Sequence, residues 1–362
     1  MRFFGKNCFV FIVFLLCKSL SLFAAEYNYA GDITLNEDTP VDTFKPTFED
    51  GDVITFDGSV NITADDSWDK PLIRIADDDI NIVIQGTNNA TLTLENSDEG
   101  IFNLMCIEDW ENVTITIKDI TIKSGDKKKS CPVVTLIGET TNCTVIFDSV
   151  QFDNWKGNVF QADEDSVDCK IYCKNCVFNC TKTALLANAK DDTIVAENCT
   201  FNNCNIAARI GAESLGTETI SLVNCTINSG SRTDKDIVFK ETGTINLAGT
   251  TAGTVELCED AVFTVLKSGD TYQRLKDDYT TETVTVGTDW TGTAEVSFAS
   301  GAEPTTSKPV VNITTTGSGN KLPTSSIPYF EKQVFLKDKT GKYAIRKNKD
   351  GTLQAAVHST SW

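Results

Sequence analysis

Residues 171–178 read IYCKNCVF, and variants of this short line recur through the middle of the chain. Successive copies begin 23–30 residues apart and read ITIKDITI (115–122), VIFDSVQF (145–152), IYCKNCVF (171–178), IVAENCTF (194–201) and ISLVNCTI (220–227). A constant local pattern with variable spacing is typical of a solenoid, in which short repeats stack and the loops between them differ in length.

Each copy alternates apolar and polar residues, as does a strand with one buried face. In the third copy Ile171 and Cys173 alternate, and the parity then slips to Cys176 and Phe178. The residues at the slips are Asp119, Ser149, Asn175, Asn198 and Asn224. All are turn-forming types, and Asp and Asn also tolerate the left-handed region of φ/ψ space. Each coil is therefore predicted to contain two short strands that meet at a sharp corner. One more strand per coil is predicted between successive copies, at 133–137, 159–162, 184–187, 206–209 and 237–240.

Three strands per coil at this repeat length resemble the right-handed parallel β-helix of the pectate-lyase-like superfamily. In that superfamily, Asn side chains at the corner between the second and third strands stack into an amide ladder. Asn175, Asn198 and Asn224 match this column, whereas Asp119 and Ser149 depart from it, so a ladder of three coils is expected. The resemblance covers roughly residues 45–265 and implies an all-β, right-handed parallel β-helix solenoid. It does not define an activity, because lyases, hydrolases, tailspikes and adhesins share the fold.

The regions that flank the repeats differ in composition. Residues 1–25 are predicted to be a signal peptide, because Arg2 and Lys6 precede a short apolar run and small residues follow it. That run is about half the length that a membrane span needs, and no other stretch is long enough, so no transmembrane segment is expected in the mature chain. The remaining predicted divisions are a parallel β-helix with an N-terminal cap (26–299), a Ser/Thr/Pro/Gly linker (300–330) and a basic C-terminal β-meander (331–362).

The charge balance limits the class of partner. The chain carries 51 acidic against 32 basic residues, a net charge of −19. Such a chain is poorly suited to nucleic acid or to an anionic membrane, and it favours neutral glycans, cations or basic proteins. Residues 331–350 are locally basic, which indicates either an attachment segment for an acidic surface or an end cap that docks on the acidic body.

The cysteines suggest two different roles. The inward column of Cys176, Cys199 and Cys225 is predicted to be a stack of buried thiols, because parallel side chains on neighbouring coils are poorly oriented for bridging. Secretion nevertheless favours disulfides. The better candidates for disulfides between coils are Cys180 with Cys204 and Cys143 with Cys169.

Eight Asn-x-Ser/Thr sequons occur, and in a eukaryotic protein this density suggests a glycoprotein. Asn198 and Asn224 lie in the proposed ladder, where we expect them to be half-buried and unmodified. The six candidate glycosylation sites, expected at turns or strand ends, are Asn61, Asn89, Asn112, Asn142, Asn179 and Asn312.

The sequence assigns no catalytic, cofactor-binding or metal-binding residue. The hydrolases of the superfamily that the chain resembles carry a Gly-His-Gly, whereas this chain has one histidine, His358, outside any such motif. A lyase needs a base and a cation such as Ca²⁺, and Arg209 and Lys240 are candidate bases at strand ends. A stripe of acidic loop residues is either a site for divalent cations or basic partners, or a solubilising surface: Asp77–Asp79, Glu108, Asp109, Glu111, Glu139, Asp163–Asp165, Asp168, Asp191, Asp192, Glu213 and Glu218.

These observations together favour a secreted or cell-surface glycoprotein that acts as an adhesin or a polysaccharide-binding protein. Its expected partners are extended glycans or proteins of a host or cell surface. Two alternatives remain open at this point: a calcium-dependent polysaccharide lyase-like enzyme and a self-assembling wall or envelope protein.

Overall fold

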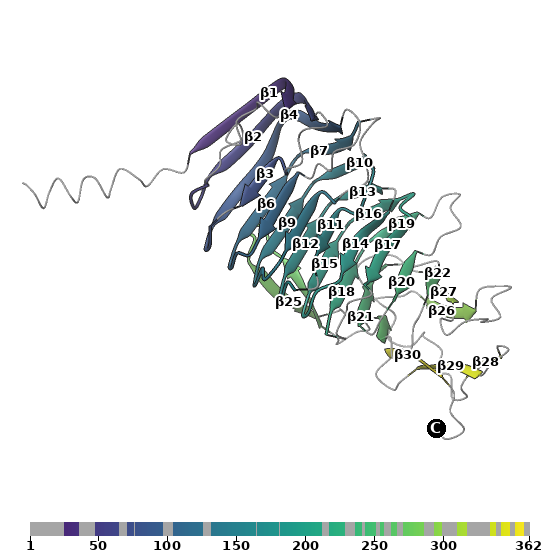
Figure 1. The fold of residues 1–362 in the computed structure, drawn as a ribbon. Coiled ribbons are helices and arrows are strands. Elements are labelled where there is room, and N and C mark those ends of the chain that lie inside the picture. The colour runs from purple at the N-terminus through teal and green to yellow at the C-terminus, as the bar shows by residue number, and fades with distance from the viewer. Residues whose placement is uncertain are drawn as a thin grey trace, which may run out of the picture.

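The repeated line folds into short strands that stack on their copies in neighbouring coils, and the computed structural model is a parallel β-solenoid of about six turns (Figure 1). It describes residues 25–35, 48–64, 71–75, 77–96, 104–125, 132–163, 165–180, 182–211, 217–228, 236–240, 243–250, 254–256, 262–265, 271–285, 293–298, 310–316, 334–337, 342–347 and 352–357. The secondary structure in these ranges is all strand. They contain no helix long and apolar enough to cross a membrane.

Each full coil contributes three strands. The first strand precedes the repeated line, the second lies before the corner within that line, and the third follows the corner. The second strands are β6 (Thr114–Lys118), β9 (Thr144–Asp148), β12 (Lys170–Lys174), β15 (Thr193–Glu197), β18 (Thr219–Val223) and β21 (Thr244–Ala248). The third strands are β7 (Thr121–Ser124), β10 (Gln151–Trp155), β13 (Val177–Cys180), β16 (Thr200–Asn202) and β19 (Thr226–Asn228). The first strands are β3 (Ile73–Ile75), β5 (Met105–Glu108), β8 (Val134–Ile137), β11 (Phe160–Ala162), β14 (Thr183–Ala187), β17 (Ile206–Ile210), β20 (Ile237–Phe239) and β22 (Thr254–Glu256).

The two ends of the solenoid depart from this plan. At the N-terminal end, β1 (Glu26–Leu35) pairs with β2 (Val53–Ala64), and β2 pairs with β4 (Asn81–Asn96), all in parallel. The long β4 serves as both second and third strand, because it pairs with β6 and with β7. The C-terminal strands are β23 (Val262–Val265), β24 (Thr271–Leu275), β25 (Thr281–Thr285), β26 (Thr293–Phe298), β27 (Val310–Thr316), β28 (Val334–Lys337), β29 (Lys342–Lys347) and β30 (Thr352–Val357).

The register confirms the predicted columns. Ile171 pairs with Val145 on one side and with Ile194 on the other, so like residues of successive copies lie directly over one another. The third strands stack the aromatic column in the same way. The ring centroids of Phe152 and Phe178 are 5.1 Å apart and those of Phe178 and Phe201 are 4.8 Å apart, with interplanar angles of 15° and 6°. These separations match the spacing between strands, so the sheet itself sets the stacking of the rings.

The predicted corner is also confirmed. The residue at each slip adopts a positive φ of 51–57°, in the left-handed region that Asn and Asp tolerate best: Asp119, Ser149, Asn175, Asn198 and Asn224. The next coil has Gly249 at this corner, with φ 61°. The column thus extends one coil beyond the recognisable copies.

The residue after each corner points into the core. Cys176, Cys199, Cys225 and Thr250, here called the thiol column, are 0–5% exposed. Cys199 Sγ lies 3.3 Å from the carbonyl oxygen of Glu197 and 3.5 Å from that of Cys173 in the preceding coil. The other members make the same pair of contacts, so each donor meets two backbone acceptors. The prediction of buried free thiols is therefore confirmed for this column.

The two cysteines of each predicted disulfide pair lie on neighbouring coils. Cys180 Sγ and Cys204 Sγ are 3.4 Å apart, longer than a disulfide bond, and both residues are buried. Cys143 and Cys169 lie directly before the paired second strands β9 and β12, and both are buried thiols.

The described C-terminal segments include the expected β-meander and one strand within the predicted linker. β28, β29 and β30 are consecutive antiparallel strands, and β30 adds antiparallel to β23. Within the predicted linker, β27 pairs with β22 and β26, so residues 310–316 extend a solenoid sheet. The predicted signal peptide (except residue 25), the rest of the linker and His358 lie outside the described residues.

Candidate functional site

The six asparagines predicted to carry glycans do not share one environment. Asn89 is exposed at a bend within β4, with φ 54°. Asn61 and Asn312 lie inside β2 and β27 rather than at turns or strand ends, and Asn179 is half-buried within β13. Asn61 Nδ2 donates to Asp32 Oδ1 at 2.8 Å. Their modification remains a prediction.

Asn112 and Asn142 belong to a second corner, which was not predicted from the sequence. The residue two positions before each of these second strands has a positive φ of 51–62°: Asp79, Asn112, Asn142, Asp168 and Asp191. Asn142 Nδ2 donates to Asn112 Oδ1 at 2.7 Å, and Asn112 Nδ2 donates to Asp79 Oδ1 at 2.9 Å. An amide ladder therefore forms here, at the start of the second strands.

The ladder predicted at the other corner is weaker. Asn224 Nδ2 donates to Asn198 Oδ1 at 3.5 Å, the limit of a hydrogen bond. Asn198 is exposed rather than half-buried, while Asn224 is half-buried as expected.

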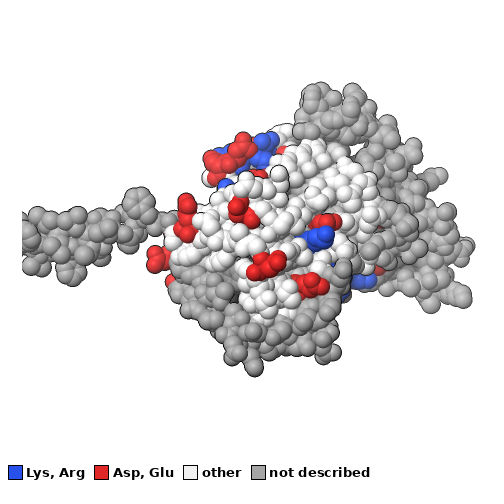
Figure 2. Space-filling view, turned by 90° about the horizontal axis from the view of Figure 1, so that it is seen from above, with Lys and Arg blue, Asp and Glu red and all other residues white. Residues whose placement is uncertain are grey.

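The exposed residues of the predicted acidic stripe cap neighbouring coils. Asp78 Oδ1 accepts the backbone N–H of Glu111 at 2.7 Å, and Asp109 Oδ1 accepts that of Glu139 at 3.0 Å. Figure 2 shows acidic side chains at separate points on a largely uncharged face. In the described ranges no group of three or more His, Cys, Asp or Glu side chains is placed to hold a metal ion, so no cluster there supports the predicted Ca²⁺ site.

Two residues predicted in that stripe are instead part of the core. Asp192 and Glu218 are fully buried, each directly before its second strand. The positions equivalent to them in earlier coils hold apolar residues and thiols, and we call the whole set the carboxyl column: Val113, Cys143, Cys169, Asp192 and Glu218.

Asp192 carries an incompletely satisfied carboxyl group. Its Oδ2 accepts the N–H groups of Asn188 and Ala189 at 3.2 and 3.1 Å, whereas Oδ1 is buried without a hydrogen-bond partner. Burial raises the pKa of Asp192 to about 7; the nearby Glu218 adds to the rise and the two N–H donors oppose it. A carboxyl group in this setting binds a proton more tightly when the protein is folded.

The two candidate lyase bases share one acidic neighbour. Lys240 Nζ lies 3.5 Å from Glu256 Oε1. Burial lowers the pKa of Arg209, and Glu256 partly offsets that effect. Both cations therefore interact with Glu256, an arrangement typical of ion pairing near a protein surface.

A hollow lies elsewhere, on the outer face of the second strands. It has a volume of about 640 Å³ and is lined by alternate residues of four adjacent strands, β4, β6, β9 and β12. These outward residues include Thr114 and Thr144 in one column and Thr116 and Tyr172 in the next. The hydroxyl groups of Thr114 and Thr144 thus lie on adjacent strands, about 4.8 Å apart, whereas Ile146 lies between Thr116 and Tyr172 in the next column. We call this hollow the threonine groove.

A hairpin from the C-terminal part of the chain provides one wall of the threonine groove. β24 and β25 form a two-stranded sheet of their own, separate from the solenoid sheets (Figure 1). Leu275 packs on Ile146, Tyr172 and Val195, which are outward residues of three adjacent strands. Tyr279 packs against the same cluster and lines the groove.

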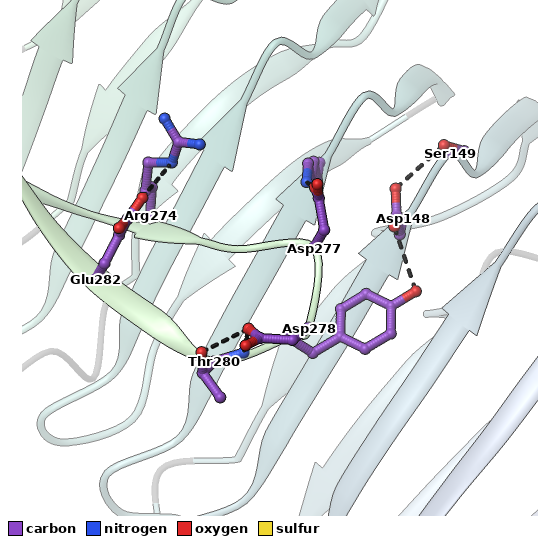
Figure 3. A network of polar contacts seen from close by, with 9 residues as sticks. Asp148, Ser149, Arg274, Asp277, Asp278, Thr280 and Glu282 are labelled. Carbon is purple, nitrogen blue, oxygen red and sulfur yellow. Dashed lines mark hydrogen bonds and ion pairs between the residues drawn. The ribbon is translucent and has the colours of Figure 1, made fainter.

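Polar contacts fix the tip of this hairpin (Figure 3). Asp277 forms an ion pair with Lys174, which lowers the pKa of Asp277. Tyr279 Oη lies 3.3 Å from Asp148 Oδ2, and burial together with this carboxylate raises the pKa of Tyr279 to about 12. Tyr279 has φ 61°, which is strained for a bulky residue. Tyr279 thus lies at the groove with a strained backbone, and its contacts with the solenoid hold it there.

The threonine groove was not identified from the sequence. No protein-family model matches the chain, and no curated protein matches its sequence. The candidate site therefore depends on its own geometry.

Proposed function

We propose that the protein is a secreted or cell-surface glycan-binding protein, acting as an adhesin, and that the threonine groove is its binding site. The row of polar side chains formed by Asn81, Thr114 and Thr144 on adjacent strands, in a groove that the strained Tyr279 also lines, carries the proposal. Sites for polar ligands combine an apolar or aromatic surface with a few oriented polar groups, and a sugar ring requires both.

The charges around the groove favour an uncharged ligand. Lys170 is the cation that lines it, and its Nζ already contacts Asp168 at 3.3 Å and Asn142 Oδ1 at 2.9 Å. Other lining side chains are hydroxyl, amide or apolar groups. A neutral polysaccharide satisfies these groups without the burial of an unpaired charge.

The test is a glycan array probed with the full secreted protein and with two matched double variants. Thr114→Ala with Thr144→Ala removes two hydroxyls from the groove. Thr200→Ala with Thr226→Ala removes two from the outer face of the third strands, on adjacent coils in the same way. We expect the groove variant to lose about tenfold in affinity, since each hydrogen bond contributes roughly 0.5–1.5 kcal/mol. The control variant should bind as the wild type does.

Several results would contradict the proposal. These are an array without neutral-glycan binding, or equal losses in both double variants. Release of an unsaturated product from a polyuronate would favour the lyase instead.

A further inference from the structure

A second hollow lies beside the threonine groove on the same face. It has a volume of about 370 Å³ and is lined by outward residues of β1, β2 and β4, among them Asn28, Thr55, Asp57, Gln85 and Thr87. These side chains are hydroxyl, amide and carboxylate groups, so the hollow is a polar counterpart of the groove.

The second hollow is internally organised by hydrogen bonds. Gln85 Nε2 donates to Thr55 Oγ1 at 3.2 Å on the neighbouring strand. Asp57 Oδ1 accepts from Thr87 Oγ1 at 2.7 Å and from Asn88 Nδ2 at 2.6 Å. These two bonds lower the pKa of Asp57, which therefore carries a negative charge at neutral pH.

Strand β4 joins the two hollows. Its outward residues Asn81 and Val83 line the threonine groove, and the next two outward residues along the same strand, Gln85 and Thr87, line the second hollow. From β12 through β9, β6, β4 and β2 to β1, the two hollows span six parallel strands in continuous pairing. At about 4.8 Å per strand this face is roughly 24 Å long.

We propose that the two hollows form one binding face for an extended, uncharged polysaccharide chain, with the second hollow as a distal subsite that only long chains reach. This inference rests on the proposed function of the threonine groove. A long chain that leaves the groove across β4 meets hydroxyl, amide and carboxylate groups able to bond its hydroxyls. The carboxylate of Asp57 at the same time disfavours uronic-acid chains.

The test measures affinity against chain length. The probes are short and long oligomers of β-1,4-linked glucose and of N-acetylglucosamine, together with galacturonate oligomers of matched length. For the wild type we expect the long uncharged oligomers to bind about tenfold more tightly than the short ones, and the galacturonate oligomers to bind weakly. Gln85→Ala with Thr87→Ala should abolish the gain from length and leave short-chain affinity unchanged. The control is again Thr200→Ala with Thr226→Ala.

The outcomes separate this inference from the function on which it rests. Equal affinity for short and long chains overturns the distal subsite while the groove stands. An equal loss for both lengths in the Gln85/Thr87 variant, or tight binding of galacturonate by the wild type, also overturns it. Absence of binding at every length, with a blank array, overturns the proposed function and the subsite together. Asp57→Asn provides a second readout, because it should strengthen galacturonate binding.

Discussion

Two buried columns flank the second strands, and they handle polar groups differently. The thiol column places Cys176, Cys199, Cys225 and Thr250 where each donor meets two backbone carbonyls. The carboxyl column places Asp192 and Glu218 in line with two thiols and a valine, and leaves one oxygen of Asp192 without a partner.

The difference shows which polar groups a stacked coil accepts. At the thiol column the backbone presents acceptors, so a small uncharged donor is satisfied in each of these four coils. A carboxylate is only an acceptor, and the N–H groups that approach Asp192 reach just one of its oxygens. Substitutions that place an acceptor in the thiol column, or remove the charge from the carboxyl column, therefore test this difference directly.

The largest effect is expected from a carboxylate in the thiol column. Cys199→Asp would direct an acceptor at the carbonyl oxygens of Cys173 and Glu197 in a site that is 1% exposed. We expect a loss of about 3–5 kcal/mol in the free energy of unfolding, as for an unpaired buried charge. Urea unfolding measures this loss, and an unchanged midpoint would show that the column relaxes around the charge.

A pH-dependent effect is expected from the carboxyl column. The folded pKa of Asp192, about 7, lies above its unfolded value near 3.8. The contribution of Asp192 to the free energy of unfolding is therefore fully present below about pH 4 and is lost as pH rises through 7. Across that window the folded protein should lose up to a few kcal/mol, since each pKa unit corresponds to about 1.4 kcal/mol.

Asp192→Asn isolates this contribution. The amide keeps an acceptor for the N–H groups of Asn188 and Ala189 and removes the titration. The difference in unfolding free energy between wild type and variant should change between pH 4 and pH 8. A difference that stays constant across this range would exclude Asp192 as the source.

A smaller effect is expected at the corner next to the thiol column. Asn198→Ala places alanine, which has a β-carbon but no turn-forming side chain, at φ 54°. This change should lower the free energy of unfolding by about 1 kcal/mol. Asn198→Gly is the matched control, because glycine already occupies this corner at position 249. Thermal unfolding compares the two, and equal losses would indicate that the side-chain bond to Asn224, not the backbone, matters here.

The smallest effect is expected when the donor is kept. Cys199→Ser retains a donor toward the same two carbonyls, as Thr250 does one coil beyond Cys225. We expect a change below about 1 kcal/mol by urea unfolding. A loss as large as that of Cys199→Asp would mean that size, and not hydrogen bonding, governs the column.

The coil core was predictable because its signal is local. Alternation within IYCKNCVF defines the buried face, and the turn-forming residue at each slip defines the corner, so register followed from alignment of the copies. The earlier corner was missed because its Asp and Asn residues lie among other polar residues. Position relative to the following strand is the signal that identifies it.

The candidate site was not predictable in the same way. The hairpin ion pair joins residues 103 apart in sequence, and the hydrogen bond of Tyr279 to Asp148 joins residues 131 apart. The alternation of TYQRL indicates a strand, but nothing local indicates the face on which it packs. The burial of Asp192 was obscured likewise, because the sequence around it, AKDDT, reads as an exposed turn.

The buried sulfur atoms of the thiol column also provide internal probes of how the solenoid unfolds. Cys176, Cys199 and Cys225 sit on successive coils, so an alkylating reagent reaches each one only when its coil separates from its neighbours. Their relative reaction rates, read by mass spectrometry, distinguish a rod that frays from its tips from one that opens all at once.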